Sequence, residues 1–135
     1  MRKILALLIV ATALGIAPIA RADTATDKTR ATAVIAYING DHAKAWKLMK
    51  PLAEQGDVPA QAWLGTLYSE GAGVPRDYVR AYMWKNIAAA STPGKNKAVY
   101  TKTRDDIAKK MTPAQIKRAE EMTHKCQASK FKQCN

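Results

Sequence analysis

The fold is decided by residues 60–90, AQAWLGTLYSEGAGVPRDYVRAYMWKNIAAA, which predict two helices joined by a glycine-bearing turn. In the first helix, apolar side chains three and four residues apart form one stripe, made of Ala60, Leu64, Leu67 and Tyr68. In the second helix, small residues and one tryptophan form a matching stripe, made of Ala81, Trp84, Ala88 and Ala89. Two such stripes predict a helical hairpin whose faces are buried against neighbouring helices.

The turn inside this stretch is predicted from its glycines. Gly71 and Gly73 end the first helix, because glycine accepts the left-handed backbone that helix ends and tight turns require. Asp77 then precedes the second helix, where a carboxylate can accept the free N–H groups. Gly65 is costly inside a helix, so we expect another helix backbone to pass close to it.

The hairpin resembles the Sel-one-like repeat family, a branch of the tetratricopeptide-like α-solenoids. The matching positions are Ala60, Leu64, Gly65, Tyr68, Gly71, Gly73, Val74, Asp77, Ala81, Trp84, Ala88 and Ala89. A partial copy precedes it, since five residues stand 36 positions before their counterparts in the second half of the hairpin: Asp41, Ala45, Leu48, Leu52 and Ala53. The first copy has a shortened turn at residues 39–41. The resemblance implies protein binding.

The predicted fold is all-α: a short α-solenoid of antiparallel helix pairs, about one and a half repeats, with a two-helix C-terminal cap. Six helices are expected, near residues 28–38, 42–55, 59–69, 77–90, 97–110 and 113–128. The partial repeat spans about 30–56, the full repeat about 57–92 and the cap about 95–135, all within one domain, 23–135. Thr112 opens the last helix with a predicted capping box that includes Gln115.

Residues 1–22 are interpreted as a secretory signal peptide. Arg2 and Lys3 precede an apolar run over 4–20, and a small-x-small cleavage pattern follows at 20–22. The alternative is a membrane anchor, but the run is at the short limit for a bilayer span. The protein is therefore expected to be exported, and periplasmic where the organism has two membranes.

Cys126 and Cys134 are the only cysteines, and export makes a disulfide between them the expected pairing. The alternative is a metal site that also uses His124, but three ligands at this spacing match no structural zinc pattern. No nucleophile, acid–base pair or phosphate-binding loop is recognisable. The sequence therefore predicts no enzyme, cofactor or metal.

Positive charge is concentrated in the cap. Without residues 1–22 the chain has 19 basic and 11 acidic residues, a net charge of +8, of which +7 falls in residues 95–135. Four of the basic residues are candidates for binding an anionic envelope polymer, lipid headgroups or an acidic protein: Lys109, Lys110, Lys117 and Arg118. The alternative is a solvated helix surface with ion pairs four residues apart, such as Asp105 with Lys109 and Asp106 with Lys110. Nucleic acid is not expected.

The predicted function is binding of another protein on the concave face formed by the first helices of the repeats. Tyr37, Gln61 and Trp63 are the predicted contacts, since the repeat pattern requires no aromatic at position 63 and a half-exposed tryptophan is a common binding anchor. Core packing of Trp63 against Leu67 is the alternative. Weak self-association is a further possibility, because a short stack leaves an end face uncovered.

Overall fold

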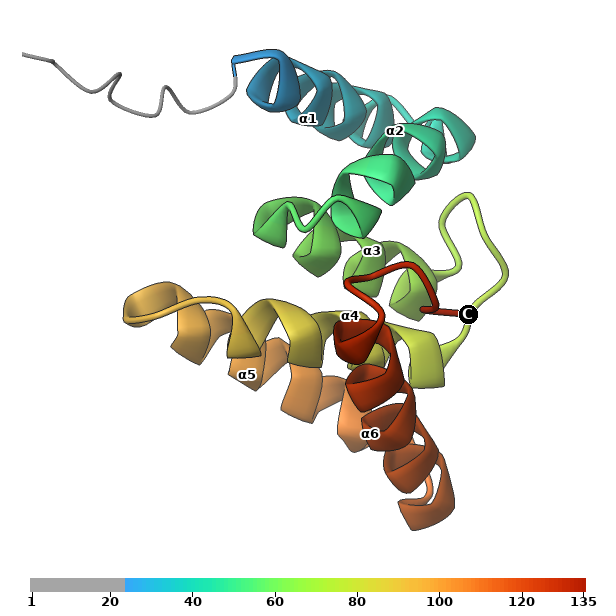
Figure 1. Ribbon diagram of the computed structural model, residues 1–135. Helices are drawn as coiled ribbons and strands as arrows, with labels where there is room; N and C mark the ends of the chain where they lie inside the picture. Colours follow the sequence, from blue (N-terminus) through green and yellow to red (C-terminus); the bar gives the residue numbers. More distant parts are fainter. Residues whose placement is uncertain (1–23) are drawn as a thin grey trace, which may run out of the picture.

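The computed structural model describes residues 24–135, which form six α-helices and contain no strand (Figure 1). The helices are α1 (Thr24–Ile38), α2 (His42–Glu54), α3 (Val58–Glu70), α4 (Tyr78–Ala90), α5 (Lys95–Ala108) and α6 (Pro113–Ala128). The predicted all-α class and helix order are confirmed, with small shifts at the helix ends. The predicted signal peptide lies outside the described residues. None of the described helices has the length and apolarity that a membrane crossing requires.

Aspartates cap the N-termini of three successive helices, α2, α3 and α4. The carboxylates of Asp41, Asp57 and Asp77 accept hydrogen bonds from backbone N–H groups three residues ahead, at 3.2, 3.0 and 3.0 Å. These caps satisfy donors that the first turn of a helix leaves free. The capping box at α6 is also confirmed, because Thr112 and Gln115 each accept a hydrogen bond from the other's backbone N–H.

The turn between α3 and α4 needs glycine at two positions. Gly71 ends α3 in the left-handed conformation, with φ 68° and ψ 36°. Gly73 also has a positive φ, 73°, and a Cβ atom there would lie 2.2 Å from the carbonyl oxygen of His42. The turn therefore packs directly on the backbone at the start of α2, so it forms a contact between the two repeats.

Helix α4 is the centre of the molecule. Consecutive helices pack against each other from α1 to α5, and α6 returns to pack on α4 (Figure 1). The predicted stripe of α4 is buried, together with Tyr82, Met83, Lys85 and Ile87, since α3 covers one side while α5 and α6 cover others. A helix with neighbours on several sides buries more than one stripe.

The C-terminal turn is fixed to α6 by the disulfide between Cys126 and Cys134, as predicted. Phe131 lies against the turn between α2 and α3, where its ring is 3.3 Å from the position of a Cβ atom on Gly56. Along α6, the buried residues are Ala119, Thr123 and Cys126. The two-helix cap thus covers α4, and its last residues reach back to the first repeat.

Candidate functional site

A hollow of about 240 Å³ opens on the side formed by α1, α3 and α5, the first helix of each pair. These three helices lie one below another in Figure 1. We call this site the aromatic hollow, and its lining residues are Tyr37, Pro59, Ala62, Trp63, Thr66, Lys85 and Tyr100. Four come from α3, while α1, α4 and α5 each supply one. The site therefore exists only when the helix pairs are stacked.

Aromatic side chains form its walls. The rings of Tyr37 and Trp63 meet edge to face, with centroids 5.2 Å apart, and Tyr37 also stacks on His42 at 5.1 Å. The Tyr37 hydroxyl donates a hydrogen bond to the Glu70 carboxylate, and this bond raises the pKa of Tyr37 above its ordinary value. Trp63 is half-buried, so part of its ring packs against the core while part lines the hollow. These contacts hold the walls in a fixed arrangement.

Lys85 reaches the hollow from α4 by crossing α3 at Gly65. A Cβ atom on Gly65 would lie 2.7 Å from Cγ and 2.9 Å from Cδ of Lys85. The absence of a side chain at Gly65 therefore makes room for the aliphatic stem of Lys85, which belongs to α4, the helix packed against α3. Long charged side chains bury such stems while their heads remain in polar surroundings.

The Lys85 ammonium is buried with little compensation. Its side chain belongs to a residue only 7% exposed, and its Nζ donates a hydrogen bond to Thr66 Oγ1 at 2.8 Å. Burial lowers the pKa of Lys85 to about 8, a shift that the charge of Glu70 only partly opposes. Among the ion pairs of residues 24–135, none includes Lys85. The hollow therefore contains a cation that forms no ion pair with a carboxylate of residues 24–135.

Gln61, one of the predicted contacts, is not at this surface. It is fully buried, and its Nε2 donates a hydrogen bond to the carbonyl oxygen of Ala53 at 3.1 Å. The reason is that α3 packs against both α2 and α4, which leaves little of it exposed. Gln61 joins two helices and has no free surface to offer a partner.

The four basic candidates of the cap lie apart from the hollow. Lys109 pairs with Asp106 at 2.8 Å, and the Lys110 ammonium lies 5.6 Å from the centre of the Tyr78 ring. The expected pairs with Asp105 and Asp106 four residues back are therefore wrong for these two lysines. Lys117 and Arg118 are exposed.

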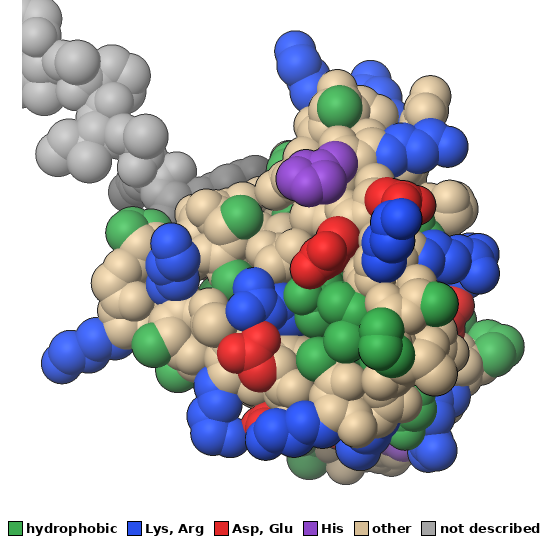
Figure 2. Space-filling view, turned by 90° about the horizontal axis from the view of Figure 1, so that it is seen from below, with side chains coloured by type: hydrophobic (Ala, Val, Ile, Leu, Met, Phe, Trp, Pro, Cys, Tyr) green, Lys and Arg blue, Asp and Glu red, His purple; other side chains and the backbone are tan. Residues whose placement is uncertain are grey.

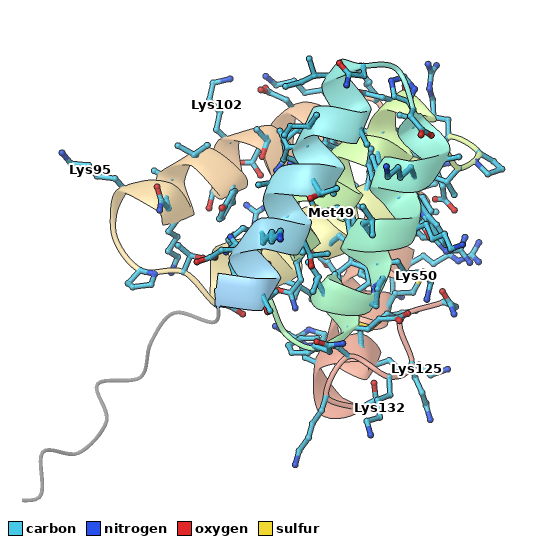
Figure 3. All side chains as sticks on the ribbon, turned by 90° about the horizontal axis from the view of Figure 1, so that it is seen from above. Met49, Lys50, Lys95, Lys102, Lys125 and Lys132 are labelled. Atoms are coloured by element: carbon cyan, nitrogen blue, oxygen red, sulfur yellow. A yellow bond between two sulfur atoms is a disulfide. The ribbon has the colours of Figure 1, made fainter. Side chains whose placement is uncertain are left out.

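Basic side chains of the cap do not converge on one patch. Figure 2, the view from below, shows Lys and Arg side chains spread round this face with acidic side chains among them. In Figure 3, Lys95 and Lys102 of α5 point away on one side, whereas Lys125 and Lys132 point away at another end. This arrangement resembles a solvated surface.

The described residues contain no cluster of three or more histidine, cysteine or acidic side chains that could hold a metal ion. Both cysteines are joined in the disulfide, and His124 is exposed. The hollow combines apolar and aromatic surface with three hydroxyl-bearing side chains and one cation, which suits recognition of a side chain or chain end.

Antiparallel helix pairs stacked around a concave surface define a helical repeat protein. Residues 36–57 and 58–92 match the Sel1 repeat, and the chain belongs to this family of tetratricopeptide-like helical repeats. Proteins of the family are helical scaffolds that typically bind other proteins. No curated protein and no solved structure matches the chain significantly.

Sequence reasoning missed Thr66, Lys85 and Tyr100 as residues of the hollow. Tyr100 is half-buried and lines the site from α5. The sequence does distinguish Lys85 in one respect, because it is the single charged residue between Ala81 and Ala90.

Proposed function

We propose that this protein is an exported scaffold that binds a partner protein in the aromatic hollow. The observation that supports this most is a hollow walled by half-buried aromatic rings on the concave side of the repeats. Tyrosine and tryptophan dominate the binding energy of many interfaces, because they bury a large area at little entropic cost. The ring contact between Tyr37 and Trp63 reduces that cost further, since the walls are ordered before binding.

The size of the hollow suits one or two side chains of a partner. Pockets for small molecules commonly measure 300–1,000 Å³, and this one holds about 240 Å³. The C-terminal turn leaves it open, because Phe131 lies on the turn between α2 and α3 instead. A partner can therefore insert a side chain while its remaining surface rests on α1, α3 and α5.

Export is part of the proposal. It rests on the charged and apolar segment of residues 1–22 and on the Cys126–Cys134 disulfide, which an oxidising compartment would maintain. Cell fractionation combined with thiol alkylation tests it: the expected result is protein in the exported fraction, shortened by about 22 residues, with both thiols protected. A full-length protein in the cytoplasm with alkylated thiols would contradict it.

Affinity capture with the mature protein tests the binding site. We expect Trp63→Ala to lose the captured partner, whereas Trp46→Ala keeps it, because Trp46 is also half-buried but lies outside the aromatic hollow. Circular dichroism must show that both variants remain folded. Loss of the partner with Trp46→Ala alone would refute the site.

The salt dependence of partner capture distinguishes this proposal from electrostatic binding to an envelope polymer, a lipid headgroup or an acidic protein. Contacts with many lysines weaken steeply as ionic strength rises, whereas binding in the hollow persists. A variant with four cap residues changed to glutamine provides the second comparison: Lys109, Lys110, Lys117 and Arg118. If this variant loses the partner and Trp63→Ala retains it, the electrostatic function replaces the one proposed.

A further inference from the structure

We propose that the aromatic hollow binds the C-terminus of its partner chain, with the Lys85 ammonium holding the terminal carboxylate. The last side chain of the partner then lies between the aromatic walls. This inference rests on the proposed function, since it specifies the chemistry that the same hollow recognises. It starts from an unusual feature of the site, a buried lysine that crosses a neighbouring helix to reach it.

The Lys85 ammonium has more hydrogen-bond donors than the described residues use. An ammonium group has three donors, and within residues 24–135 the hydrogen bond of Lys85 goes to the hydroxyl of Thr66. Thr66 and Lys85 both line the hollow, so the charged group is at its wall and not in the closed core. An entering oxygen atom can therefore accept a hydrogen bond from Lys85.

Charge complementarity favours an anion. A buried charge is costly unless an opposite charge or several hydrogen bonds compensate it. Glu70, the carboxylate whose charge acts on Lys85, already accepts the Tyr37 hydroxyl and forms no ion pair with Lys85. The lowered pKa of Lys85 is consistent with this missing compensation. A carboxylate from the partner would supply it.

A chain end fits this hollow better than an internal acidic residue. In the C-terminal residue, the carboxylate and the side chain share one Cα atom, so a single residue meets both Lys85 and the aromatic walls. An internal segment in extended form would need two residues on the same face, about 7 Å apart. It would also bring backbone N–H and C=O groups on both sides of the contact into a hollow whose walls are mostly apolar and aromatic.

The probes are N-acetylated tetrapeptides ending in Leu, Phe or Met, each made as the free acid and as the carboxamide. A third peptide type has an internal Glu and a carboxamide end. Binding to the oxidised mature protein is measured by calorimetry. We expect at least one free acid to bind ten or more times more tightly than its carboxamide and than the internal Glu peptide.

Two variants locate the effect. Lys85→Met is expected to remove the preference for the free acid while weak binding of the carboxamide remains. Trp63→Ala is expected to lose both. Lys109→Met is the matched control, because Lys109 is exposed and outside the hollow, and it should keep the preference.

Several results would overturn the inference: no free acid binds, acid and carboxamide bind equally, the internal Glu peptide binds best, or Lys85→Met keeps the preference. None of these results alone removes the proposed function, which fails instead if Trp63→Ala still captures the partner. The two proposals are therefore refuted by different measurements.

Discussion

Replacing Lys85 with methionine should stabilise the folded protein at neutral pH. Methionine keeps an unbranched apolar stem to lie over Gly65 and removes the buried charge. A residue that costs stability where it stands, and that lines a surface hollow, is the kind of residue that function retains. The effect on the free energy of unfolding therefore bears directly on the role of Lys85.

The magnitude follows from the pKa of Lys85, which falls from 10.5 to about 8 on folding. At 1.36 kcal/mol per pKa unit, the charged side chain destabilises the fold by about 3 kcal/mol. The lost hydrogen bond to Thr66 offsets about 1 kcal/mol of the gain. We therefore expect Lys85→Met to be more stable than the wild type by about 2 kcal/mol at pH 7.

The advantage should depend on pH with a defined sign. Between about pH 8 and 10.5, the unfolded chain binds more protons at this lysine than the folded chain, so wild-type stability gains a contribution as pH rises. The advantage of Lys85→Met is complete below pH 8 and falls by about 3 kcal/mol as pH rises to 10.5, so the variant loses its advantage before pH 10.5. Tyr37, Tyr68 and Tyr82 have raised pKa values and destabilise both proteins at high pH, so their effect cancels in the difference.

Urea unfolding of both proteins, followed by circular dichroism at pH 7, 8, 9 and 10 with the disulfide intact, measures this difference. The reasoning would be refuted by a variant that is less stable than the wild type at pH 7. A stability difference that stays constant across this range would refute it equally, because it would show that the ammonium is not desolvated.

Gly73→Ala should destabilise the protein by about 3 kcal/mol, because a left-handed backbone with a side chain costs 1–2 kcal/mol and the added Cβ overlaps the carbonyl oxygen of His42. Gly40→Ala is the control, since Gly40 has a positive φ but open space around it; equal losses in urea unfolding would show that the close contact is unimportant. Reduction of the Cys126–Cys134 disulfide should lower the free energy of unfolding by about 2.5 kcal/mol, the chain-entropy value for a loop with a sequence separation of 8. An unchanged melting temperature after reduction and alkylation would contradict this.

The fold was predictable because its determinants are local. Asp77, Gly71 and Thr112 mark helix ends through hydrogen bonds within a few residues, and the structure contains these caps and turns. The apolar stripes are local features too, because their residues recur three and four positions apart along each helix. Such features depend little on how the helices later pack.

The hollow was only partly predictable. Trp63 was recognisable as an aromatic that the repeat pattern does not require, and both Trp63 and Tyr37, two of the predicted contacts, line the hollow. Gln61 and Lys85 could not be placed, because their burial depends on which helices cover α3 and α4. Lysine side chains are seldom buried, and the burial of Lys85 follows from the space that Gly65 leaves for its stem across α3.

The most direct test of partner binding in the aromatic hollow is photo-crosslinking in intact cells. Benzoylphenylalanine at position 100 replaces Tyr100 in the wall of the hollow, and the same residue at position 47 replaces Lys47, which is exposed on α2. We expect a discrete crosslinked partner from position 100 and none from position 47. A crosslink from position 47 with none from position 100 would contradict the account.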